Sequence, residues 1–134
     1  MKVIVDTSVW SLAFRRREAA ADPAVTALLR LIEEGRVVLL GPVRQEVLSG
    51  IKHQAQFERL RDHLAAFPDP ELGMRDYESA AELCNRCMAQ GVQAAHVDFL
   101  IAAVAMDRKW AVLSTDRDFE HIAKVVPVQV HRPV

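Results

Sequence analysis

The chain has 134 residues, of which 51% are hydrophobic and 26% charged, and its formal net charge is −1. We expect a single domain over residues 1–134 with its own core, and a cytoplasmic protein, because no apolar run reaches the roughly 18 residues of a membrane span or resembles a signal peptide. The near-neutral charge excludes a broadly basic surface that binds nucleic acid by charge alone, which leaves local basic patches or bound cations for any such chemistry.

Strand and helix patterns alternate along the chain. In chain order, the sequence predicts a strand at 2–5, a helix at 9–14, a helix from 22–23 to the glycine at 35, a strand at 37–40, a helix from 41–42 through 51, helices at about 54–67 and 75–90, a helix at 97–106, a strand at 112–113, a helix from 114–116 through 122, and a strand at 126–130. Short apolar strands that alternate with helices predict a parallel sheet covered on both faces. We therefore expect an α/β fold.

Two cysteines, Cys84 and Cys87, have the Cys-x-x-Cys spacing found in redox and metal sites. They lie inside a predicted helix, and the five histidines offer no pair at a zinc-binding spacing. We interpret both cysteines as reduced thiols of the core and expect no structural zinc.

Acidic residues follow two of the predicted strands. Asp6 comes directly after the first strand, and Asp116 follows the strand that ends near Leu113. Because ligands bind at the carboxyl ends of the strands in open parallel sheets, these acids indicate a site at that edge. Asp98 stands near the start of an otherwise apolar helix, so it needs a polar partner or a wet cavity. Glu46, at the margin of the helix after the second strand, is placed similarly.

Carboxylates that converge on one pocket repel each other, and raised pKa values or a bound cation relieve the repulsion. Oxygen ligands without Cys or His favour a hard ion such as Mg²⁺ or Mn²⁺, which supports phosphodiester hydrolysis by lowering the pKa of a bound water. Each acid also has an ordinary explanation: Asp6 and Asp116 as helix caps, Glu46 as a solvated residue, and Asp98 as the partner of a cation. Together these explanations do not account for a lone aspartate in an apolar helix and two acids at strand ends.

The segments around these acids resemble the motifs of the PIN-domain ribonucleases, in particular the VapC toxins of type II toxin–antitoxin pairs. They are V-I-V-D-T-S-V-W, P-V-R-Q-E-V-L-S-G, H-V-D-F-L-I-A-A-V-A and L-S-T-D-R-D-F-E-H-I, and the resemblance covers nearly the whole chain. It places the family's catalytic and metal-binding acids at Asp6, Glu46, Asp98 and Asp116. Ser8 matches a small polar position, Ser114 retains the hydroxyl where many relatives have threonine, and Asp118 is a nearby acid that competes with Asp116 as a metal ligand.

The resemblance implies a PIN-like three-layer α/β/α sandwich with a short, mostly parallel central sheet of four to five strands. It implies an endoribonuclease that hydrolyses RNA phosphodiester bonds with bound Mg²⁺, or with Mn²⁺ as a substitute. The implied partners are RNA, a cognate VapB-type antitoxin whose C-terminal segment covers the active-site groove, and a second copy of the chain in a homodimer.

Basic residues near the predicted acids are candidates for holding an RNA backbone. They are Arg15, Arg16, Arg17 and Arg44. A solvated charge run is the ordinary explanation for the triple arginine. We interpret Trp10 and Phe14 as core or dimer-interface residues and not as platforms for base stacking.

Other classes fit the sequence less well. A phosphoryl-accepting receiver domain expects an acidic pair after the first strand, and an aspartate-nucleophile phosphatase expects a second aspartate where this chain has Ser8. The stronger alternative is a non-catalytic or regulatory PIN-type module that binds RNA or protein, since a fold does not guarantee activity. That alternative predicts that some of the four acids are missing, and all four are present.

Overall fold

The computed structural model describes residues 1–15 and 22–133, without the side chain of Arg15. The predicted RNA-binding residues Arg16 and Arg17, and the side chain of Arg15, therefore lie outside the described part of the chain. Within that part, no helix is both long enough and apolar enough to cross a membrane.

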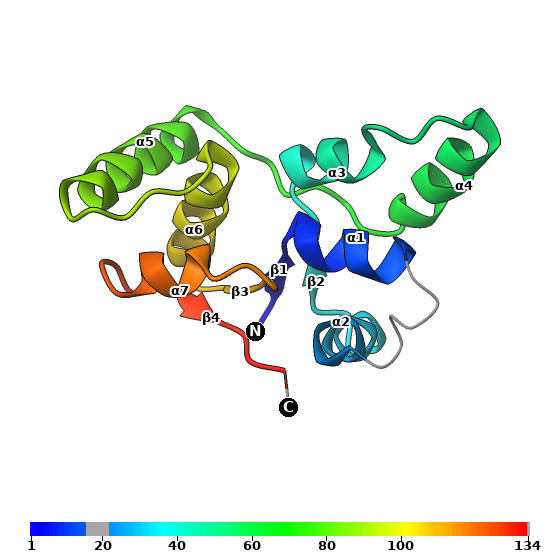
Figure 1. The fold of residues 1–134 in the computed structure, drawn as a ribbon, viewed down its shortest axis with the longest axis horizontal. Coiled ribbons are helices and arrows are strands. Elements are labelled where there is room, and N and C mark those ends of the chain that lie inside the picture. Colours follow the sequence, from blue (N-terminus) through cyan, green and yellow to red (C-terminus); the bar gives the residue numbers. More distant parts are fainter. Residues whose placement is uncertain (16–21, 134) are drawn as a thin grey trace.

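Helices and strands alternate as the sequence predicts. In chain order, the elements are β1 (Val3–Val5), α1 (Thr7–Arg15), α2 (Pro23–Glu33), β2 (Val37–Val38), α3 (Gly41–Leu48), α4 (Gln54–Leu64), α5 (Met74–Ala89), α6 (His96–Arg108), β3 (Ala111–Leu113), α7 (Asp118–Ala123) and β4 (Gln129–Val130). Figure 1 shows α5, α6 and α7 gathered on one side of β1, and α1 to α4 on the other.

Two strands are shorter than predicted. Leu39 and Leu40 are fully buried but lie past the end of β2, where Leu40 already forms the N-cap of α3. The last strand was expected from Val126, but β4 starts only at Gln129. The backbone N–H of Val126 donates to Ile122 of α7 instead of to a neighbouring strand. Both segments are apolar because they are buried, and the sequence pattern alone does not distinguish them from paired strands.

The described strands form one parallel sheet in the order β2-β1-β3-β4. The chain leaves β1 toward β2 on one side, whereas β3 and β4 lie on the other side of β1. The strand order therefore reverses between β1 and β3, and in open parallel sheets such a switch point leaves a crevice beyond the carboxyl ends of the two strands. The backbone N–H of Asp6 donates to the carbonyl of Leu113 at 2.9 Å, so the two strands remain paired up to this crevice.

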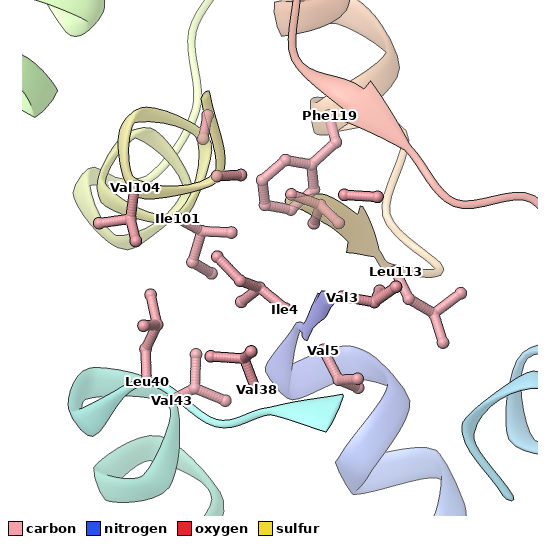
Figure 2. Close-up of a cluster of buried hydrophobic side chains, with 14 of the residues drawn as sticks. Val3, Ile4, Val5, Val38, Leu40, Val43, Ile101, Val104, Leu113 and Phe119 are labelled. Carbon is pink, nitrogen blue, oxygen red and sulfur yellow. The ribbon is translucent and has the colours of Figure 1, made fainter. Parts of the chain in front are cut away.

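The core lies on both faces of the sheet. Successive side chains of a strand point to opposite faces, and Figure 2 shows Ile4 of β1 directed toward Ile101 of α6 while Val3 and Val5 point away from it. All three residues of β1 are fully buried. A strand that is buried on both faces needs a helical layer on each, so the predicted α/β/α fold is confirmed. Cys87 is a buried free thiol and Cys84 a half-buried one.

Candidate active site

Asp6 occupies the crevice at the end of β1. Its backbone carbonyl accepts the N–H groups of Val9 and Trp10 at the start of α1. Its carboxylate accepts two hydroxyls at Oδ2, from Ser8 at 2.9 Å and from Ser114 at 2.8 Å. In the described part of the chain, no N–H of α1 donates to this carboxylate, so the side chain does not act as a helix cap. The residue is only 6% exposed.

Ser8 and Ser114 join the two strand ends. Their hydroxyl oxygens lie 3.2 Å apart, and each accepts a backbone N–H from the loop after β3. The N–H of Thr115 donates to Ser8 Oγ at 3.1 Å, and that of Asp116 donates to Ser114 Oγ at 2.9 Å. A hydroxyl at each position therefore holds Asp6 and fixes the loop that carries Asp116.

Three carboxylates converge beside Asp6, and we call them the acid cluster. One oxygen each from Asp98, Asp116 and Asp118 lie within 4.8 Å of one another. Asp98 stands in the first turn of α6 and is 8% exposed. Asp118 opens α7 and is half-buried, and Asp116 is exposed in the loop between β3 and α7. The cluster thus has a buried end and an open end.

The loop geometry explains why Asp118 joins the cluster. The sequence predicts that the helix after β3 opens at residues 114–116, but α7 begins at Asp118. The N–H of Asp116 binds the Ser114 hydroxyl, and the N–H of Asp118 binds Asp116 Oδ1 at 3.0 Å. These bonds from side chain to backbone make a turn that competes with the helix, and both acids consequently reach Asp98.

The electrostatics of Asp98 are those of a carboxylate without a counter-ion. Burial, together with the negative charges of Asp6, Asp118 and Asp116, raises its pKa to about 7, although the N–H of Ala95 donates to it at 3.3 Å. In the described residues it forms no ion pair, which removes the ordinary explanation for its place in an apolar helix. Burial and the neighbouring Asp116 also raise the pKa of Asp118.

This donor set fits a hard divalent cation. It consists only of carboxylate oxygens, and these lie close enough to share one ion. Burial first, and the neighbouring carboxylates second, raise the pKa of both Asp98 and Asp118. Such an ion prefers oxygen ligands and would relieve the repulsion among the carboxylates. The cluster is therefore a candidate metal centre.

Glu46 lies beside the first residue of α1. It is exposed on α3, and its Oε1 accepts the hydroxyl of Thr7 at 3.2 Å. Thr7 directly follows Asp6, so this bond places Glu46 at the margin of the crevice, outside the acid cluster. Thr7 is not among the residues that the sequence singled out. The missed signal was its position between a strand-end acid and a helix.

Arg44, which the sequence singled out as a possible RNA contact, is engaged within the protein. Its guanidinium donates to Asp69 at 2.9 Å and to the carbonyls of Leu64 and Phe67. It therefore ties α3 to the end of α4 and to the loop that follows. A role in RNA binding stays a prediction, and these bonds leave few donors for it.

The fold is a parallel α/β sheet, and carboxylates gather at its switch point in a candidate metal centre. These two features define the class of the protein as an α/β protein with an acidic site at the edge of its sheet. A family model described as the PIN domain matches residues 3–125, and the chain belongs to this family.

Similar sequences and structures come from bacterial proteins. The chain is 29% identical to the VapC ribonuclease Mb1587 of Mycobacterium bovis and to the ribonuclease VapC11 of Mycobacterium tuberculosis, over 95% of this chain and 96% of each relative. Its fold resembles that of FitAcB from Neisseria gonorrhoeae, with a TM-score of 0.74 and 20% identity over 98% of this chain and 97% of the other. It also resembles VapBC2 from Rickettsia felis bound to a promoter DNA fragment, with a TM-score of 0.76 and 15% identity over 98% of both chains.

Proposed function

We propose that this chain is a single-domain, metal-dependent endoribonuclease of the cytoplasm that acts as the toxin of a toxin–antitoxin pair. The convergence of Asp98, Asp116 and Asp118 beside Asp6 at the switch point carries the proposal. The names of the mycobacterial relatives as VapC ribonucleases support the reaction. The likeness to the VapBC2 structure, and to a toxin–antitoxin complex from Klebsiella pneumoniae with a TM-score of 0.61, supports the toxin role.

We assign different roles to the acids according to where they lie in the site. We assign metal binding to the acid cluster and Asp6, with Mg²⁺ as the ion and Mn²⁺ as a substitute. When bound, such an ion stabilises charge on a phosphate and lowers the pKa of a bound water. Asp6 Oδ2 is occupied by the hydroxyls of Ser8 and Ser114, which orients Oδ1 for a ligand. Glu46, whose Oε1 holds the Thr7 hydroxyl, has its second oxygen available to accept a proton.

Three partners belong to the proposal. RNA is the substrate, with Arg15, Arg16, Arg17 and Arg44 as candidate contacts to its backbone. A cognate VapB-type antitoxin would block the active-site groove, and a second copy of the chain would complete a homodimer.

The test combines an assay in cells with one in solution. Expression of the chain should arrest growth, and Asp6→Asn should relieve the arrest. The purified protein should cleave single-stranded RNA with Mg²⁺ or Mn²⁺, and chelation of the metal should stop it. An RNA-binding protein that cleaves no RNA with either ion would support the non-catalytic alternative and overturn this proposal.

A further inference from the structure

A groove of about 620 Å³ lies between α1, α3 and α4, and Glu46 is part of its lining. This volume falls within the range of about 300–1,000 Å³ that is typical of ligand pockets. Its lining includes Ser11 and Phe14 of α1, Glu46 of α3, and Gln56, Arg59 and His63 of α4. Since Glu46 holds the Thr7 hydroxyl directly after Asp6, the groove continues the crevice of the active site.

Phe14 presents a fixed aromatic surface on this groove. Its ring stacks nearly parallel on Trp10, with 6.2 Å between the ring centroids and 11° between the planes. Trp10 is 1% exposed and also packs on Phe67, so it holds the ring of Phe14 in place. Phe14 itself is 49% exposed, so it is not a core residue, and its prediction as a dimer-interface residue stays untested. The stacking role proposed below replaces the sequence-based interpretation that Phe14 is no platform for bases. An exposed ring that is already held in place loses little conformational freedom when a flat group stacks on it.

The opposite wall of the groove is polar. Gln56, Arg59 and His63 are three or four residues apart on α4, which places them on one face of the helix. All three are exposed, and within the described part of the chain Arg59 forms neither an ion pair nor a side-chain hydrogen bond. A cation that faces a groove without an internal partner is available to an anionic ligand.

We propose that this groove binds one nucleotide of single-stranded RNA next to the cleaved phosphodiester, with the base stacked on Phe14 and a phosphate held by Arg59. The inference rests on the proposed function and names where its substrate lies. Bases of single-stranded RNA are recognised by stacking on aromatic side chains and by hydrogen bonds to their edges, which Gln56 and Ser11 are placed to make. A nucleotide supplies both groups that the lining can bind, a flat ring for Phe14 and a phosphate for Arg59, whereas a peptide without an acidic residue would leave Arg59 without a partner.

Binding to labelled single-stranded RNA, measured by fluorescence anisotropy in EDTA so that no cleavage occurs, tests this assignment. Phe14→Ala should weaken binding about tenfold, within the range expected for the loss of one base stack, and Phe14→Tyr should retain it. Arg61, which lies outside the groove lining on the same helix and pairs with Asp62, provides the matched control. Arg61→Ala should bind as the wild type does.

Salt dependence separates the two roles. Removal of one phosphate contact should lower the slope of log affinity against log salt by about 0.7 in Arg59→Ala, because single strands release counter-ions in that proportion. Phe14→Ala should weaken binding equally at all salt concentrations. With RNAs that carry one abasic site, the loss in Phe14→Ala should disappear at one position of the strand.

The outcomes distinguish this inference from the proposed function. If the wild type cleaves RNA and the two variants bind and cleave as it does, the groove does not hold RNA although the nuclease assignment stands. The groove is likewise no RNA site if the variants keep RNA binding but lose binding of an antitoxin-derived peptide. If the wild type cleaves no RNA, the proposed function itself fails.

Discussion

Two aspartates occupy equivalent places in consecutive helices yet have opposite electrostatics. Asp76 is the third residue of α5, and Asp98 is the third residue of α6. Each carboxylate accepts the backbone N–H of the residue before its helix, from Gly73 at 2.9 Å and from Ala95 at 3.3 Å. Judged by local geometry alone, both are capping residues.

Their partners differ. Arg108, at the end of α6, donates two hydrogen bonds to Asp76 and lowers its pKa. Asp98 forms no ion pair in the described residues, and burial together with the charges of the neighbouring carboxylates raises its pKa to about 7. The first pair joins α5 to α6, whereas the carboxylates around Asp98 repel one another until a proton or a bound cation relieves the repulsion. The unpaired buried Asp98 therefore belongs to the candidate metal centre, whereas the paired Asp76 joins two helices.

The largest difference between the two aspartates should appear in catalysis. Asp98→Asn, like Asp6→Asn, should lower the rate of metal-stimulated RNA cleavage at least about 100-fold, more than the loss of a group that only supports a metal ligand. Asp76→Asn should keep most of the activity of its folded fraction. Steady-state cleavage assays with circular dichroism to verify folding would measure this. Equal activity in wild type and both active-site variants would remove the catalytic assignment.

The free energy of unfolding should depend on the ion pair of Asp76, which is not needed for catalysis. Arg108→Ala should lower the free energy of unfolding by about 1.5–3 kcal/mol, because it leaves the Asp76 side chain, 14% exposed, without its charged partner. Arg61→Ala, which removes an exposed pair at 3.2 Å, should change it by less than about 1 kcal/mol. Urea unfolding at pH 7 gives both values. A loss no larger in Arg108→Ala than in the control would show that the Asp76 pair contributes little.

Asp98→Asn should stabilise the metal-free protein at pH 8 by about 1–2 kcal/mol, since each tenfold change in proton affinity corresponds to about 1.4 kcal/mol and nearby water relieves part of the repulsion. The sign follows from the raised pKa. The folded wild type binds the proton more tightly than the unfolded chain does, so its stability falls as the pH rises from about 4 to about 7.

Asp98→Asn has no carboxyl group to titrate at this position, so its free energy of unfolding should fall less than that of the wild type between about pH 4 and about pH 7. Thermal unfolding in EDTA between pH 4 and pH 8 measures the difference between the two proteins. Addition of Mg²⁺ or Mn²⁺ should raise the unfolding temperature of the wild type and leave that of the variant nearly unchanged. If the stability of the wild type and that of Asp98→Asn change in parallel with pH in EDTA, the pKa of Asp98 is not raised in the folded protein.

Much of this contrast could be predicted from the sequence. Apolar runs bounded by acids located β1 and β3, and the lone acid in the apolar pattern of α6 singled out Asp98. Burial is visible in the sequence as an apolar run, and the acid that follows such a run lies at the carboxyl end of the strand. Asp76 drew no attention because a polar residue at the start of a mixed helix is ordinary, and its partner Arg108 lies 32 residues away.

Other features were missed for two reasons: a local turn that competes with a helix, and contacts between segments that are far apart in the sequence. Asp118 joins the cluster because two side-chain bonds delay the start of α7. Arg44 is held by carbonyls that α4 and its following loop bring to it. Phe14 repeats the apolar pattern of α1, but the fold leaves its ring at the edge of a groove. The partners of Arg44 and the groove beside Phe14 come from segments that only folding brings together, whereas the turn before Asp118 is local and competes with the helix.

The smallest expected effect concerns Ser114, whose hydroxyl donates to Asp6 and accepts the N–H of Asp116. Ser114→Thr should behave as the wild type, because the hydroxyl is kept. Ser114→Ala should lower the free energy of unfolding by about 1 kcal/mol and the cleavage rate by about tenfold, since it loosens Asp6 without removing a carboxylate. Cleavage rates and urea unfolding of both variants measure these effects. A loss in Ser114→Ala as large as that in Asp98→Asn would mean that the hydroxyl itself contacts the metal or the substrate, and Asp6 would then have to share its assigned role.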